Sequence, residues 1–114
     1  MWKKAKLLFN AVYQISKQCN DPSDKFIMQQ ILRSGLSIPS NIAEAYGRQY
    51  KKDSLQFLAI SRGSLYETES IVEILFENKF IDSDQYETIM LNITDLKKLL
   101  HGTIRYFKSE KLNQ

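Results

Sequence analysis

The residue types that most often carry out catalysis are few in this sequence and are not grouped. His101 is the only histidine and Cys19 the only cysteine. Zinc sites need clusters of these residues, and di-metal helical bundles need Glu-x-x-His pairs, whereas Lys98 stands three positions before His101. The sequence also has no phosphate-binding loop of the Gly-x-x-x-x-Gly-Lys type. We therefore expect a non-enzymatic protein with no catalytic, metal-binding or cofactor-binding residues.

A row of polar residues recurs at helical spacing before the middle of the chain. Its members are Gln30, Arg33, Ser37, Asn41, Glu44 and Arg48. This row, together with Arg62 and Glu69, has three possible interpretations. It forms a ligand-binding cleft, it is a solvated helix face with an interhelical ion pair, or it is a contact between subunits. Small residues such as Ser34, Gly35 and Ser64 are poor helix formers on a solvated face and are better placed where another helix packs closely. The sequence therefore favours the subunit contact.

Arg62 and Glu69 fall on or beside the apolar stripe of the following segment. A buried charge costs on the order of several kcal/mol unless it is paired, so we expect partners on the preceding helix. Glu67 and Glu69 point about 200° apart around a helix and are not expected to share a site. In a helical hairpin, Arg33 lies level with Glu67, and Ser37 with Ser64. The candidate interface or interhelical network comprises Arg33, Ser37, Asn41, Glu44, Arg62, Ser64, Glu67 and Glu69.

Lysine and arginine are expected at one end of the molecule, although the net charge is only +3. Helices that run up and down in turn bring together the start of the first, the second turn and the end of the fourth. The basic residues there are Lys3, Lys4, Lys6, Arg48, Lys51, Lys52, Arg105 and Lys108. Tyr46, Tyr50 and Tyr106 accompany them, and this mixture suits a phosphate backbone and unstacked bases. Helix dipoles explain only about half of the charge pattern.

We expect RNA or DNA to be the partner of this basic end. The alternative is a protein-interaction scaffold without a nucleic-acid role, in which the basic end only aids solubility. Trp2, Phe9 and Tyr13 form a second stripe on the first helix and favour a contact with a partner chain. The sequence has no long apolar run, so we expect a cytoplasmic protein with no membrane partner. The lone His101 has no evident partner and is expected to be a partly exposed helix residue.

Four segments with apolar residues at spacings of three and four must position these side chains. They cover residues 2–19, 24–46, about 52–77, and from a capping box at Asp82 to about residue 107. Short turns between them predict an all-α, antiparallel up-down-up-down four-helix bundle. We expect one domain over residues 1–114, with 109–114 frayed. Gly35 and Pro39 predict a bend near Ser37 and Pro39 in the second helix, or a break followed by a new helix start.

Two motifs in the centre of the chain are specific. The first is Ser37-Ile38-Pro39-Ser40-Asn41-Ile42-Ala43-Glu44, followed by Arg48. The second is Phe57-Leu58, then Ser61-Arg62-Gly63-Ser64-Leu65, with Glu67 and Glu69. Both resemble the small four-helix bundle proteins encoded in intervening sequences of bacterial large-subunit ribosomal RNA genes. The resemblance covers nearly the whole chain in length and helix order.

This resemblance implies a homo-oligomer, typically a pentamer, with no established enzymatic activity. The family is also similar to the accessory protein of diversity-generating retroelements, which binds nucleic acid and a reverse transcriptase. That similarity supports binding at the basic end by analogy only. Two residues depart from the usual pattern: Ala45 replaces a glycine and Ser61 replaces an alanine. The motif residues carry over, with no catalytic role, as Ser37, Pro39, Asn41, Glu44, Arg48, Arg62, Gly63, Ser64 and Glu67.

Overall fold

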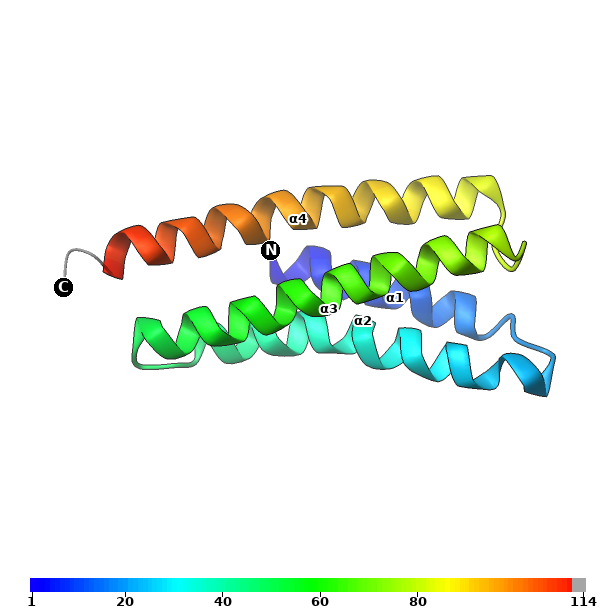
Figure 1. Cartoon of the computed structure of the whole chain (residues 1–114), viewed down its shortest axis with the longest axis horizontal. Coiled ribbons are helices and arrows are strands. Elements are labelled where there is room, and N and C mark those ends of the chain that lie inside the picture. Colours follow the sequence, from blue (N-terminus) through cyan, green and yellow to red (C-terminus); the bar gives the residue numbers. More distant parts are fainter. Residues whose placement is uncertain (112–114) are drawn as a thin grey trace.

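Four α-helices make up most of the computed structural model, which describes residues 1–111. They are α1 (Trp2–Ser16), α2 (Lys25–Tyr46), α3 (Lys51–Glu77) and α4 (Ser83–Lys111), with a short 3-10 helix η1 (Pro22–Asp24) before α2. The helices lie lengthwise beside one another and alternate in direction (Figure 1). No β-strand occurs in residues 1–111. The predicted all-α, up-down-up-down four-helix bundle is therefore confirmed. Of the tail expected to fray, 109–111 belong to α4, and 112–114 lie outside the described residues.

The core runs along the bundle axis and contains apolar residues from all four helices. Each helix contributes them at spacings of three and four, which place these side chains on one face. Burial of each large aliphatic side chain contributes about 1.5–3 kcal/mol relative to exposure. The largest fully buried aliphatic residues are Leu8, Val12, Ile31, Ile38, Ile42, Leu58, Leu65, Val72, Ile93, Leu96 and Leu100.

The turn between α1 and α2 begins earlier than the sequence predicts. α1 ends at Ser16, three residues before the expected boundary at Cys19. Cys19 is half-buried, and its thiol donates to the Asp21 carbonyl at 3.4 Å. The Asp21 carboxylate accepts a hydrogen bond from the Ser23 backbone N–H at 3.0 Å, which lowers the pKa of Asp21. This cap starts η1, so the turn and not α1 occupies residues 17–21.

α2 runs without a break through Pro39. The expectation of a new helix start after a break is therefore wrong, whereas the expected bend stays a prediction. Pro39 has no N–H and leaves the Gly35 carbonyl without its usual helical donor. Gly35 also allows α1 to pack closely, because a Cβ atom there would lie 3.2 Å from the Val12 Cγ2 atom. Tertiary packing thus keeps α2 helical where its local sequence is weakest.

α1 is much shorter than its neighbours, and this shapes one end of the bundle. It has 15 residues against 29 in α4, or about 22 Å against about 44 Å at the α-helical rise. The N-terminus is set back from the end of the molecule reached by the α2–α3 turn and α4 (Figure 1). The Thr103 Oγ1 atom lies 3.6 Å from the Met1 Sδ atom. Beyond this level the bundle consists of α2, α3 and α4.

Candidate functional site

The structure brings together the residues that the hairpin register pairs between α2 and α3. Arg33 and Glu67 form an ion pair. The Ser64 hydroxyl donates to the Ser37 hydroxyl at 2.7 Å. α2 and α3 pack together more extensively than any other pair of helices. The predicted register of the helical hairpin is therefore confirmed at these two residue pairs.

Small hydroxyl side chains fill the contact between α2 and α3. The Ser34 and Thr68 hydroxyls lie 2.8 Å apart. The Ser61 hydroxyl donates to the Ile38 carbonyl at 2.9 Å, and the Ser54 hydroxyl donates to the Ala45 carbonyl at 2.6 Å. Ser34, Ser54, Ser61, Ser64 and Thr68 are all buried inside a single chain. The preference for a subunit contact is wrong for Ser34 and Ser64, because helices of the same chain cover them.

The outward-facing part of the polar row is bonded mainly to itself. Glu44 and Arg48 form an ion pair one helical turn apart. The Asn41 side-chain amide donates to the Ser37 carbonyl at 2.8 Å and to the Ser37 hydroxyl at 2.9 Å. The Arg48 guanidinium lies 4.5 Å from the centroid of the Phe57 ring. These side chains stabilise the surface of the α2–α3 hairpin and do not converge on a cleft.

Arg62 and Glu69 face α4, and not α2 as the sequence led us to expect. The Lys97 ammonium lies 2.7 Å from the Glu69 carboxylate and 5.0 Å from the centroid of the Tyr66 ring. Arg62 lines a separate hollow that does not include Glu69. The structure therefore does not form the ligand-binding cleft in which Arg62 and Glu69 would lie together.

This hollow, which we call the basic hollow, lies between α3 and α4 and has a volume of about 390 Å³. Ile104 is buried beneath it. The other lining residues are Arg62, His101, Arg105 and Lys108. No acidic side chain is found among the described residues that line it. Four nitrogen-bearing side chains around an apolar floor suit a phosphate group, which arginine binds with two parallel N–H donors.

The sequence did not identify His101 as part of this site. The residues that line the hollow come from α3 and α4. Only the packing of these two helices places Arg62 beside the last turns of α4. His101 also has a partner, contrary to our expectation, because its Nε2 atom lies 3.2 Å from the Tyr66 hydroxyl oxygen. This contact orients the imidazole, which lines the hollow. The available signal was the helical spacing of four residues from His101 to Arg105 and of three from Arg105 to Lys108.

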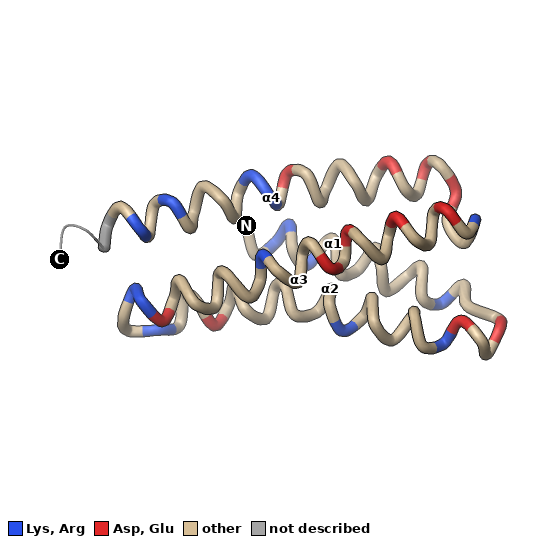
Figure 2. The backbone as a smooth tube through the Cα atoms, in the orientation of Figure 1, with Lys and Arg blue, Asp and Glu red and all other residues tan. Residues whose placement is uncertain are grey.

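The basic residues predicted at one end do not form a single cluster. Figure 2 shows lysine and arginine gathered toward the end with the α2–α3 turn and the end of α4, and acidic residues toward the other. Because α1 starts further back, Lys3, Lys4 and Lys6 do not reach that end (Figure 1). Lys4 lies 3.2 Å from Asp95, and Lys6 lies over the Trp2 ring. The end itself carries Arg48, Lys51, Lys52, Arg105 and Lys108.

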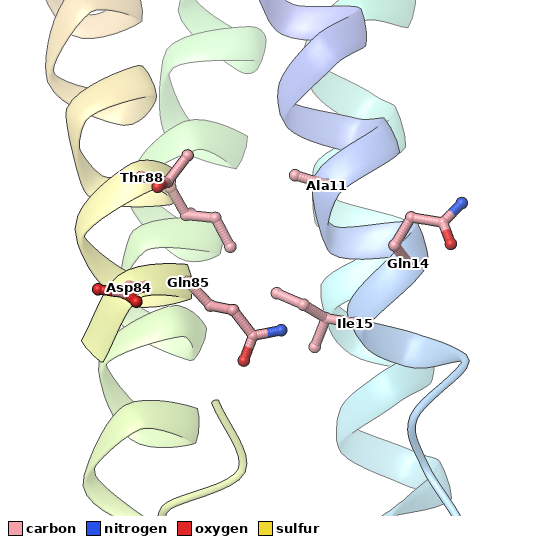
Figure 3. Close-up of a pocket in the computed structure, with 7 residues that line it drawn as sticks. Ala11, Gln14, Ile15, Asp84, Gln85 and Thr88 are labelled. Carbon is pink, nitrogen blue, oxygen red and sulfur yellow. The ribbon is translucent and has the colours of Figure 1, made fainter. Parts of the chain in front are cut away.

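A second hollow, of about 320 Å³, opens between α1 and α4 near the acidic end (Figure 3). Its lining residues include the apolar Ala11, Ile15 and Ile89. In Figure 3 the Gln85 side chain reaches toward Ile15, whereas Gln14 points away from the gap. Its polar groups do not converge on one point. We interpret it as the gap left where α1 and α4 separate.

Residues 1–111 lack two particular kinds of site. No three or more histidine, cysteine, aspartate or glutamate side chains are grouped so that they could hold a metal ion. None of the described helices combines the length and the apolar character needed to span a bilayer. The basic hollow is the candidate site, because four nitrogen-bearing side chains meet there.

Comparisons with known proteins agree with this architecture. The family model described as 23S rRNA-intervening sequence protein matches residues 1–102. The chain is also similar to a crystal structure of a protein with unknown function from the S23 ribosomal protein family of Bacteroides thetaiotaomicron. The TM-score is 0.83 and the identity 33%, covering 90% of this chain and 96% of that one. No curated protein matches the chain. The family match includes both central motifs, Arg62 and His101.

Proposed function

The chain belongs to the 23S rRNA-intervening sequence protein family, and on this premise we propose that it is a non-enzymatic, homo-oligomeric bundle that binds RNA or another nucleic acid through its basic half. The basic hollow carries the proposal. Arg62, Arg105 and Lys108 face one space without an acidic neighbour among its described lining residues. Such an arrangement is unfavourable without an anion, since like charges repel one another.

A phosphate group supplies the missing negative charge. The two guanidinium groups bind phosphate oxygens through paired N–H donors, and the Lys108 ammonium adds a positive charge. Ile104 is buried below the hollow and keeps water away from that side of it. Charge interactions are stronger where the effective dielectric constant is lower. Arg48, which pairs with Glu44, and Lys52 belong to the α2–α3 turn and the start of α3 at the same end of the bundle, and can meet further phosphates of the same strand. The partner is therefore a polyanion with regularly spaced phosphates.

Oligomerisation would raise the affinity of this small site. A few phosphate contacts bind weakly at physiological salt. A ring, for which the family resemblance implies a pentamer, repeats the site and gains avidity on one strand. The aromatic stripe on α1 supports a contact between subunits, because Trp2 is 44% and Tyr13 43% exposed. Side chains of this kind are typical of protein interfaces.

The test measures binding of a fluorescein-labelled 20-nucleotide RNA by anisotropy over a range of salt concentrations. We expect Arg105→Gln/Lys108→Gln to weaken binding about tenfold or more, because two charged contacts are lost. The slope of log affinity against log salt should become shallower by about 1 for each phosphate contact removed. Lys25→Gln/Lys79→Gln, at the acidic end, is the charge-matched control and should retain most of the affinity.

Equal effects of the two double variants would contradict a localised site. Solution mass from light scattering tests the oligomer separately, and a monomer would overturn that part of the proposal. The alternative function is a protein-interaction scaffold, which the exposed stripe of Trp2 and Tyr13 also fits. An oligomer whose mass does not change on addition of RNA at low salt would favour this scaffold.

A further inference from the structure

An aromatic groove lies on α4 beside the basic hollow, at the end of the bundle that α1 does not reach. It is formed by α2 and α4 and has a volume of about 440 Å³. Its lining residues are Tyr46, Lys98, Leu99, Gly102, Thr103, Tyr106 and Phe107. Thr103 is also the residue that meets Met1, so the groove begins where α1 begins. The short first helix therefore leaves this part of α2 and α4 uncovered.

The groove presents aromatic rings that the core does not use. Tyr46 is 61% and Tyr106 58% exposed, whereas Phe107 is partly buried and packs against the core. The Tyr46 and Phe107 rings meet edge to face, with centroids 6.2 Å apart. The Tyr106 ring centroid lies 5.9 Å from that of Phe107 and 6.0 Å from the Lys51 ammonium. Flat apolar surfaces close to positive charges suit a planar ring that is attached to an anion.

We propose that this groove holds an unstacked base of a single-stranded nucleic acid, while a phosphate of the same strand occupies the basic hollow. The groove uses residues 98–107 of α4 and the hollow uses residues 101–108, so the two sites flank the same stretch of one helix. A helix with its side chains is about 10–12 Å across. One strand that crosses α4 can therefore reach both sites.

This inference rests on the proposed function and narrows it to single strands. Bases inside a duplex are paired and stacked, and their faces are not available to a protein. Single-strand binding proteins combine a positive surface with aromatic side chains on which bases stack. Stacking needs only the flat face of a base, so little sequence preference is expected. The protein should prefer a single strand to a duplex of the same length.

The experiment compares three fluorescein-labelled probes: a 12-nucleotide oligouridine, an abasic strand of the same length and charge, and a duplex of that length. The wild-type protein should bind oligouridine about 5- to 150-fold more tightly than the abasic strand, the range expected for stacking of a base on an aromatic ring. Tyr46→Ala/Tyr106→Ala should abolish most of this difference and leave abasic binding unchanged.

Two control variants separate stacking from other effects. Tyr46→Phe/Tyr106→Phe keeps both rings and should retain the preference for bases. Phe26→Ala removes an exposed ring at the opposite end of the bundle, where α2 begins, and should also retain it. Circular dichroism confirms that each variant is folded. The abasic comparison in the wild-type protein needs no variant and remains decisive if a variant fails to fold.

Each outcome has a separate meaning for the groove and for the proposed function. Equal binding of oligouridine and the abasic strand, with both weakened by Arg105→Gln/Lys108→Gln, would overturn the groove and leave the proposed function intact. No binding of any probe at low salt would overturn both. A change in solution mass of Tyr46→Ala/Tyr106→Ala would show that the groove is a contact between protein chains, and would also overturn the inference.

Discussion

The contact between α2 and α3 differs in chemistry from the contacts made by α4. Between α2 and α3, the buried polar groups are neutral hydroxyls such as those of Ser34 and Thr68. Most polar contacts of α4 with the other helices use ionisable groups, such as Lys4 with Asp95, Lys97 with Glu69, and Tyr86 with Glu73. The hydroxyl contacts are buried, whereas these ionisable groups remain partly exposed.

This difference has consequences for both stability and binding. Small side chains allow two helices to approach closely, and each buried hydroxyl then finds a partner on the facing helix. Long charged side chains keep helices further apart and leave hollows beside them. We therefore expect the α2–α3 hairpin to be the most stable part of the molecule, and the two sides of α4 to be the parts that meet ligands.

The largest expected effect comes from enlarging a small residue between α2 and α3. Ser61 is fully buried against the Ile38 carbonyl. Ser61→Leu should lower the free energy of unfolding by about 1–3 kcal/mol, because the extra volume forces the helices apart. Urea unfolding followed by circular dichroism measures the change. Ser61→Ala should cost less, about 0.5–1.5 kcal/mol for the lost hydrogen bond. An unchanged free energy of unfolding in Ser61→Leu would show that this contact is not tightly packed.

The outer face of α3 should respond in the opposite way. A Cβ atom at Gly63 would have no neighbouring atom within 4 Å. Gly63→Ala should therefore raise the free energy of unfolding by about 0.5–1 kcal/mol through helix propensity alone. Gly35→Ala is the matched comparison, because its Cβ atom would lie 3.2 Å from Val12. Gly35→Ala should raise the free energy of unfolding less than Gly63→Ala does. An equal increase would argue against close packing of α1 on α2.

The ion pair between α1 and α4 should contribute little. The side chains of Lys4 and Asp95 are 38% and 40% exposed. Lys4→Met should change the free energy of unfolding by less than about 1 kcal/mol, since water and salt screen such pairs. The difference in free energy of unfolding between the wild-type protein and this variant should become smaller as the salt concentration rises. A loss as large as that of Ser61→Leu would mean that α1 depends on this pair for its position.

The smallest effect concerns the pH dependence of the contact between α3 and α4. The Tyr86 hydroxyl donates to the Glu73 carboxylate at 2.5 Å, and this hydrogen bond raises the pKa of Tyr86 above the ordinary value near 10. A raised pKa stabilises the folded state below the unfolded value, and this contribution is lost as the pH rises through the folded value.

An alkaline titration followed by tyrosinate absorbance measures this effect. Glu73→Gln should lower the pKa of Tyr86, because its ionisation no longer places two negative charges together. The stacked Phe76 and Tyr86 rings, with centroids 4.1 Å apart, should persist in this variant. The Ser34–Thr68 contact has no ionisable group and should show no such dependence. An unchanged titration in Glu73→Gln would assign the raised pKa to another cause.

Local patterns in the sequence determined the helices and their order. Apolar spacing placed residues such as Leu8, Leu65 and Leu100 on buried faces, because an α-helix repeats every 3.6 residues. Short turns then required neighbouring helices to be antiparallel, and this set the level of Arg33 with Glu67. The interruption by Pro39 was misjudged in part, because propensity describes an isolated helix and omits the packing that holds α2 together.

Tertiary structure decided which side each polar residue faces and how far each helix reaches. Spacing along α3 gave no reason to place Arg62 beside His101 and Arg105, since these residues meet only through the packing of α3 on α4. The level at which α1 begins separated Lys3, Lys4 and Lys6 from the other basic residues and left Tyr46 and Tyr106 uncovered. Periodicity specifies a face of a helix, whereas the neighbour of that face depends on how the complete chain packs.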